Sequence, residues 1–226
     1  MKIPLRIAIA GLGTVGGGVL KALKARGHEL AERAERRLDI VAISARTKSK
    51  ARASDISAFK WVDDPVALAR TDADVVVELI GGESGVALEL IEASLLAGKH
   101  VVTANKALLA HHGARLAKLA EERGLALKFE AAAAGGIPIV KALRESLIAH
   151  GVSSVRGILN GTCNYILTDM EKTERSFEEV LQEAQALGYA EADQTLDVGG
   201  GDTAHKLAIL ACLRSEDRRA RQECRS

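Results

Sequence analysis

A glycine-rich motif near the N-terminus constrains the fold of this 226-residue chain more than any other feature. The short apolar run Leu5–Ala10 predicts a strand, and the motif Gly11-Leu-Gly-Thr-Val-Gly16 follows it at once. Val19, Leu20 and Leu23 then recur at helical spacing. Strand, GxGxxG and helix in this order form the context of a dinucleotide-binding fold, although a glycine turn with a purely structural role is the alternative.

The glycine motif predicts how a dinucleotide would be bound. The first glycine allows a tight turn, the second lets the backbone approach a pyrophosphate, and the third lets the helix pack closely on the strand. The helix N-terminus then offers its oriented N–H groups to the phosphates. We expect six consecutive residues to contact the cofactor: Gly11, Leu12, Gly13, Thr14, Val15 and Gly16.

The second predicted strand, residues 38–43, bears on the choice of cofactor. The acid expected at its far end, where it would bind a ribose 2′-hydroxyl, is missing, and Arg46 follows instead. A guanidinium there can pair with a 2′-phosphate, which favours NADP over NAD. NAD stays possible, because a solvated basic loop is the alternative reading of residues 46–50.

Strand and helix patterns alternate through the first half of the chain. Residues 74–80, 100–103 and 125–129 read as further strands, and residues 86–96 and 108–123 as helices. This alternation predicts an α/β fold with a Rossmann-type doubly wound parallel sheet. Lys106 directly follows the strand at 100–103, at the carboxyl edge where ligands of open α/β sheets bind, so we expect it to contact a ligand.

The alternation of strand and helix patterns stops at residues 130–138, a loop of mostly alanine and glycine, and we place the domain boundary there. Residues 1–130 are predicted to form the dinucleotide-binding domain, and residues 131–226 an incomplete α+β domain for substrate and dimerisation. In the second part we predict a helix over 139–149, a strand over 153–159 and a turn at Asn160-Gly161. A capping box from Ser176 to Glu179 opens another helix, which Gly188 ends.

Residues 191–206 gather four carboxylates around one lysine. Asp202 and Lys206 are four residues apart at the start of a predicted helix, so they share one face. Glu191, Asp193 and Asp197 precede them in an acidic loop. Carboxylates can hold an ammonium group and a lysine can polarise a carbonyl, so the cluster suits a small zwitterion. The alternative is a solvated loop with an ion pair at a helix start.

Charge and cysteine usage exclude several classes of protein. With 31 basic and 30 acidic residues the net charge is +1, which indicates neither a nucleic-acid-binding nor a membrane-binding surface. Cys163, Cys212 and Cys224 lack CxxC spacing, which favours a reducing cytoplasm over disulfides or a structural zinc. There is no run of about twenty apolar residues, and glycines interrupt the N-terminal apolar run too early for a signal peptide. We therefore expect a cytoplasmic protein.

Five motifs together resemble homoserine dehydrogenase. They are GLGTVG, TANK at 103–106, EAAAAGGIPI at 130–139, NGTCNYIL at 160–167, and GYAEAD followed by GGDTAHKLAILA within 188–211. The resemblance implies an NAD(P)-dependent oxidoreductase of threonine and methionine biosynthesis. Its members interconvert L-homoserine and L-aspartate 4-semialdehyde.

The resemblance also implies roles for individual residues. Lys206 would be the catalytic acid/base, and Lys106 would lie beside the nicotinamide and the substrate. The positions that match substrate-binding residues are Glu191, Asp197, Asp202 and Lys206, and Gly188 matches a cofactor contact. A sodium ion would be bound by Glu130 and the carbonyls of Ala133, Gly135 and Ile137.

The chain departs from the family pattern in three places, one of which is the run Gly199-Gly200-Gly201, more flexible than the usual turn. Gln194 stands where the family usually has proline, and residues 214–226 lack apolar periodicity where the family continues with further sheet. We therefore expect a truncated chain whose apolar residues 207–213 are covered by the partner in a homodimer or cause aggregation. Two functional hypotheses follow: an NADP-preferring homoserine dehydrogenase, or an inactive remnant that binds nucleotide or dimerises without turnover.

Overall fold

The computed structural model describes residues 2–147, 149–190 and 195–214. The chain divides into two compact units, Met1–Gly136 and Ile137–Ser226, which we call unit 1 and unit 2. The boundary that the sequence predicts, after residue 130, lies a short way before this division. Among the described residues, no helix combines the length and the apolar character needed to cross a membrane.

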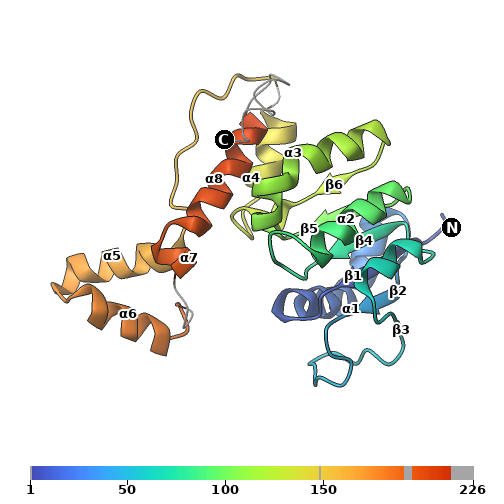
Figure 1. Cartoon of the computed structure of the whole chain (residues 1–226), viewed down its shortest axis with the longest axis horizontal. Helices are drawn as coiled ribbons and strands as arrows, with labels where there is room; N and C mark the ends of the chain where they lie inside the picture. The colour runs from blue at the N-terminus through green and yellow to red at the C-terminus, as the bar shows by residue number, and fades with distance from the viewer. Residues whose placement is uncertain (1, 148, 191–194, 215–226) are drawn as a thin grey trace. The chain divides into compact units, whose positions relative to one another are not determined.

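Unit 1 is a parallel sheet covered by helices (Figure 1). Its strands are β1 Leu5–Ala10, β2 Leu38–Ser44, β3 Lys60–Trp61, β4 Val75–Glu78, β5 His100–Thr103 and β6 Leu127–Lys128, in the order β3-β2-β1-β4-β5-β6. The helices are α1 Thr14–Ala34, η1 Pro65–Arg70, α2 Val86–Leu96, α3 Lys106–Glu122 and η2 Glu130–Ala132. All five strand pairings are parallel, which confirms the predicted doubly wound fold.

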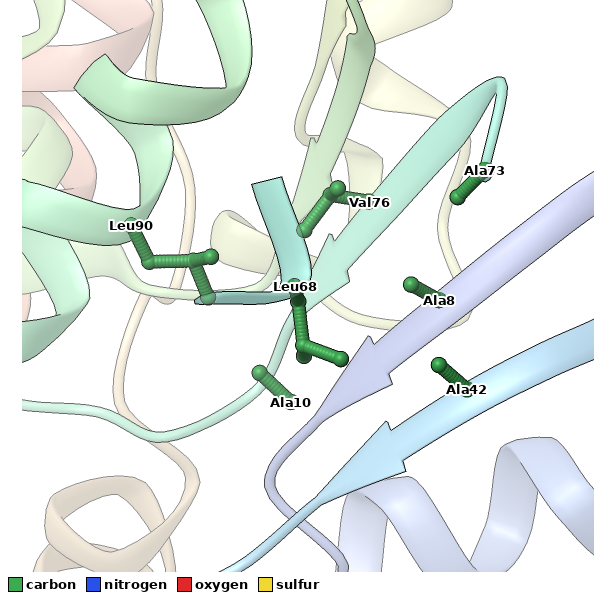
Figure 2. Close-up of a cluster of buried hydrophobic side chains, with 7 residues drawn as sticks. All are labelled: Ala8, Ala10, Ala42, Leu68, Ala73, Val76 and Leu90. Atoms are coloured by element: carbon green, nitrogen blue, oxygen red, sulfur yellow. The ribbon is translucent and has the colours of Figure 1, made fainter. Parts of the chain in front are cut away.

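Side chains of the central strands alternate between the two faces of the sheet. On one face, small residues of β1, β2 and β4 pack against η1 and α2; this cluster comprises Ala8, Ala10, Ala42, Leu68, Ala73, Val76 and Leu90 (Figure 2). On the other face Ile7, Ile9 and Ile43 pack with Leu20 of α1. Alanines on the first face let the covering segments approach the sheet closely, and both faces are therefore buried, as the apolar run of β4 predicts.

Several elements of unit 1 differ from the sequence-based bounds. The strand predicted over 74–80 ends at Glu78, because the N–H groups of Ile80 and Gly81 turn back to bond the Glu78 carboxylate. Asp64 caps the segment Pro65–Arg70, accepting from the Val66 N–H at 2.9 Å, and the segment forms a 3₁₀ helix. Residues 60–61, which the sequence left unassigned, pair with β2 as an edge strand.

The regular elements described in unit 2 are all helical. They are α4 Ile139–Lys141, the π-helical segment η3 Ala142–Ser146, α5 Gly161–Thr173, α6 Phe177–Ala186, α7 Thr195–Val198 and α8 Gly201–Arg214. Helices α5 and α6 enclose a small apolar core of Ile166, Val180, Leu181, Ala184 and Ala190. The capping box of Ser176 and Glu179 is present, and Gly188 adopts a φ of 76° just past α6, as predicted.

Three predictions for unit 2 are wrong. Residues 153–159 form no strand, because β-propensity alone cannot hold one and no described strand of this unit is available to pair with it. Asn160 is not part of a turn but the N-cap of α5. The helix predicted over 139–149 ends at Ser146 in a π-helical turn. A short helix, α7, also forms within the stretch that the sequence presents as a loop.

Candidate functional site

The turn between β1 and α1 is closely packed at two of its glycines. Gly11 has a φ of 94°, and a Cβ there would lie 2.3 Å from the carbonyl oxygen of Leu79. A Cβ on Gly16 would lie 2.0 Å from the Gly11 oxygen. These two glycines are therefore required by the backbone itself, at a turn where the Gly11 N–H also donates to the Ser44 carbonyl at 2.9 Å.

Gly13 differs from its neighbours, because nothing lies within 4 Å of a Cβ placed on it. It is the N-cap of α1, where no side chain caps the helix and no acid stands in the first turn. The first N–H groups of α1 thus face an open, uncapped terminus, which is suited to an anion. Nearby, the fully buried Ser44 Oγ at the end of β2 has no hydrogen-bond partner in the described structure. An open glycine, an uncapped helix and an orphaned hydroxyl fit a bound dinucleotide.

The other residues of the motif divide by exposure. Leu12 is buried in the core beneath the turn, so its side chain serves packing and only its backbone can meet a ligand. Thr14 and Val15 are exposed on the first turn of α1. Of the predicted cofactor contacts, all but Gly188 belong to unit 1; Gly188 belongs to unit 2.

Arg46 follows β2 in an exposed basic loop. Among the described residues its guanidinium has no hydrogen-bond or ion-pair partner, so it can bind a ligand without breaking a contact within the protein. The loop itself is held by Arg52, which donates to the carbonyls of Thr47, Lys48 and Lys50. Arg52 also lies over the Trp61 ring, with its guanidinium carbon 5.8 Å from the ring centroid.

A polar network joins the carboxyl ends of β4 and β5. The buried Thr103 hydroxyl donates to Glu78 Oε2 at 2.6 Å and accepts from the Asn105 N–H at 3.0 Å. The Asn105 amide in turn donates to the Gly82 carbonyl at 2.7 Å and caps α3 by accepting from the Leu108 N–H. Lys106 is the first residue of α3, so this network fixes the backbone that carries it.

Unit 2 holds Lys206 in a second polar network. Its Nζ donates to Asp202 Oδ2 at 2.7 Å and to the Leu159 carbonyl at 2.8 Å. Asp202 and Lys206 lie one helical turn apart and form an ion pair, in agreement with the prediction that they share one face of the helix. Asp202 is only 3% exposed, so the ion pair is partly desolvated and more strongly held than a surface pair.

Asn160 organises this second network, a role that was not predicted from the sequence. Its Nδ2 donates to Asp197 Oδ1 and to Asp202 Oδ2, both at 2.9 Å, while its Oδ1 accepts from the Cys163 N–H at 2.7 Å. One side chain thereby joins the starts of α5 and α8 to α7. An asparagine before a helix is a recognisable N-cap in the sequence. Its bonds to carboxylates far along the chain become visible only in the folded structure.

Cys163 lies half-buried against the same carboxylates. Burial first, and then the negative charges of Asp197 and Asp202, raise the pKa of its thiol above the ordinary value. The thiol is therefore neutral at neutral pH, and its Sγ donates to the Asp197 carbonyl at 3.3 Å. Such a cysteine is a packing and hydrogen-bonding group rather than a nucleophile.

The predicted sodium ligands fall on both sides of the division between the units. Ala133 is fully buried with an extended backbone, and the next residue, Ala134, has a φ of 51°, which is uncommon for a residue with a side chain. Gly136 follows with a φ of 90°. In the described part of the chain, no three His, Cys, Asp or Glu side chains are placed to hold a metal, so a cation here would be held mainly by carbonyl oxygens.

Glu191, the predicted ligand of the substrate ammonium, lies outside the described residues, as does its neighbour Asp193. The structure thus brings together Asp197, Asp202 and Lys206 in unit 2, and it places the glycine turn, Arg46 and Lys106 along the carboxyl edge of the sheet in unit 1.

Two family models match the chain. One, described as homoserine dehydrogenase, NAD binding domain, matches residues 11–130. The other, described as homoserine dehydrogenase, matches residues 138–222. Together they cover most of both units, and the gap between the two matches, residues 131–137, lies in the loop of mostly alanine and glycine.

Individual relatives agree with the family models. Homoserine dehydrogenases of Neisseria gonorrhoeae and Pseudomonas aeruginosa are each 49% identical to this chain over 93% of its length. The crystal structure of a homoserine dehydrogenase from Thiobacillus denitrificans matches 94% of the chain at 44% identity with a TM-score of 0.87. The chain spans 48% of the two curated relatives and 49% of the solved one.

Proposed function

The chain belongs to the homoserine dehydrogenase family, and we propose that it interconverts L-homoserine and L-aspartate 4-semialdehyde with a nicotinamide cofactor. The proposal assigns cofactor binding to unit 1 and proton transfer to unit 2. It concerns the activity of the whole family protein, about half of whose length this chain spans.

The observation that carries the proposal is the setting of Lys206. Among the described residues, two of the three donors of its ammonium group are taken by Asp202 and the Leu159 carbonyl. We assign the third donor to the substrate oxygen. When bound, a reduced nicotinamide cofactor would supply the hydride that the aldehyde carbon takes up in the direction of reduction. The carbonyl electron pair then moves to the oxygen, which takes a proton from Lys206 Nζ.

The carboxylates of unit 2 would hold the amino-acid end of the substrate. Among the described residues, Asp197 accepts one side-chain hydrogen bond, from Asn160, and its partly exposed carboxylate has oxygen lone pairs left for an ammonium group. Glu191 is assigned to the same ammonium by resemblance. Fixing both ends of a small zwitterion orients the reacting carbon before hydride transfer, which is where much of the rate enhancement arises.

We assign NADP as the preferred cofactor. Support comes from Arg46, which has no partner among the described residues, and from the lack of an acid at the end of β2. Lys106, at the first position of α3, is assigned to the nicotinamide end of the cofactor and to the substrate. Gly188 is assigned to the cofactor by resemblance alone.

Three further features belong to the proposal. A sodium ion bound by Glu130 and the carbonyls of Ala133, Gly135 and Ile137 is supported by the positive φ values in that loop. A homodimer is supported by Leu207 of α8, which is 46% exposed, although Ile209 and Leu210 of the same helix are buried, contrary to the expectation that residues 207–213 are left uncovered. A cytoplasmic location is supported by the scattered cysteines, which show no disulfide or metal spacing.

The test is reduction of NADP⁺ by the purified chain with L-homoserine, followed by the absorbance of the reduced nicotinamide ring. We expect turnover with L-homoserine and none with L-serine, which is one methylene shorter. Binding of NADP⁺ without turnover on L-homoserine would refute the proposed activity and support the alternative of a nucleotide-binding protein.

A further inference from the structure

Glu78 is a fully buried carboxylate that the proposed mechanism does not use. It ends β4, where its Oε1 accepts from the N–H groups of Ile80 at 2.7 Å and Gly81 at 3.2 Å. Its Oε2 accepts from the Thr103 hydroxyl at 2.6 Å. A buried acid in an otherwise apolar parallel strand is unusual, which suggests that the charge of Glu78 has a function.

The hydrogen bonds around Glu78 suit its ionised form. The Thr103 oxygen accepts from the Asn105 N–H, so the hydroxyl proton is directed to Glu78 Oε2. The two backbone groups at Oε1 are also donors. If Glu78 carried a proton toward Thr103, the buried Thr103 hydroxyl would lose its acceptor, which is costly. All three hydrogen bonds at this carboxylate are thus donated to it, an arrangement that suits a negative charge.

Within the described residues, no cationic side chain pairs with this charge. In the part of the chain that the structure describes, Glu78 forms no ion pair with a lysine, arginine or histidine. A buried carboxylate held only by neutral donors is costly to retain. Buried charges of this kind cluster at functional sites, where the missing partner arrives with a ligand.

The position of Glu78 indicates which ligand that is. The next residue, Leu79, donates its N–H to Ala10 at 2.7 Å, and its carbonyl is the atom that a Cβ on Gly11 would strike. Glu78 therefore backs directly onto the glycine turn, at the point where the sheet order passes from β1 to β4. A doubly wound sheet binds one nucleotide on each side of this point. The glycine turn and Arg46 belong to the first half, and Glu78 belongs to the second, which receives the nicotinamide.

We infer that Glu78 is the electrostatic partner of the oxidised nicotinamide ring. The oxidised ring carries a positive charge that the reduced ring lacks, so a fixed negative charge in this half of the site would favour NADP⁺ over NADPH. The effect needs no direct contact, because charges interact over several ångströms in a protein interior. The same charge would assist hydride donation, during which positive charge develops on the ring. This inference rests on the proposed function, since it requires a nicotinamide cofactor.

The test compares the affinities of NADP⁺ and NADPH, measured by calorimetry, for the wild-type chain and Glu78→Gln. The substitution removes the charge and keeps the shape of the side chain. We expect it to weaken NADP⁺ relative to NADPH by about threefold to thirtyfold, the range for unit charges at an effective dielectric constant of about 20. An unchanged ratio of the two affinities would overturn the inference.

Thr103→Val is the matched control. It breaks the same network and keeps the Glu78 charge, so it should weaken both cofactor forms alike. If Glu78→Gln gives the same pattern as Thr103→Val, Glu78 acts only as a structural residue and the inference fails.

A measurement on the wild-type chain covers the case in which Glu78→Gln does not fold. A dinucleotide with a neutral benzamide ring in place of the nicotinamide ring should bind more weakly than NADP⁺, and equal affinities would overturn the inference. Failure of the wild-type chain to bind NADP⁺ or NADPH would overturn the proposed function as well. If the wild-type chain turns over L-homoserine but binds NADP⁺ and the benzamide analogue equally well, the proposed function stands and only the role of Glu78 is overturned.

Discussion

Replacing Asn160 with serine separates the two things that this side chain does. Serine is as good an N-cap as asparagine, so the hydrogen bond to the Cys163 N–H is retained in kind. The shorter hydroxyl cannot donate to two carboxylates at once. The substitution therefore removes the bridge between Asp197 and Asp202 and leaves the start of α5 intact.

The size of the effect follows from the contacts. A hydrogen bond to a charged group contributes about 1.5–3 kcal/mol to stability, and two are lost. Asp197 is partly exposed, so water replaces much of its lost bond. Asp202 is nearly fully buried and keeps Lys206. We therefore expect local stability around α5 and α8 to fall by about 2–4 kcal/mol.

Hydrogen exchange of the amides in α5, α6 and α8 measures this loss, because it reports the free energy of local opening for each segment. Ser176→Ala is the matched control, since it removes an N-cap in the same unit without touching Asp197 or Asp202, and it should cost about 1 kcal/mol at α6. If Asn160→Ser costs no more than this control, or exchange in α8 is unchanged, the bridge does not hold the site together and the reasoning is refuted.

Other predictions follow from unit 1. Arg46→Asp should weaken NADP far more than NAD, because the guanidinium is assigned to the 2′-phosphate; equal weakening in calorimetry would remove the basis for that assignment. Gly13→Ala should fold normally, since its Cβ meets open space, but bind the cofactor more weakly, whereas Gly16→Ala should fail to fold; thermal melts and cofactor titrations distinguish them. Hydrogen bonds from Arg6 lower the pKa of Asp74 from its ordinary 3.8 to about 2, so the pair stabilises the fold above about pH 4 and loses this effect as pH falls to about 2. Because the Asp74 side chain is 28% exposed, solvent screening limits the effect to about 1–2 kcal/mol; in urea titrations Asp74→Asn should lose that amount at neutral pH and progressively less as pH falls through about 2.

Local patterns were enough to predict most of unit 1. The bounds of β1, α2 and β5 agree with the sequence-based ones, because alternation, helical spacing and the glycine turn are each encoded within a few residues. The pairing of Asp202 with Lys206 was predictable for the same reason, since the two residues lie one helical turn apart.

The residues that join segments could not be predicted in this way. Asn160 bonds Asp202 from 42 positions away, and Glu78 bonds Thr103 from 25 positions away. Each looks ordinary in its own stretch, as a turn residue or as an acid at the end of a strand. The false strand at 153–159 has the same cause, because strand formation depends on a partner that a single segment does not reveal.

The central claim is that Lys206 transfers the proton to and from the substrate oxygen. Lys206→Ala, measured beside the wild-type chain for reduction of NADP⁺ by L-homoserine, tests it most directly. We predict that turnover falls by about a hundredfold or more while NADP⁺ affinity stays unchanged, because the lost group acts on the substrate and not on the cofactor. Near-normal turnover of Lys206→Ala would contradict the account.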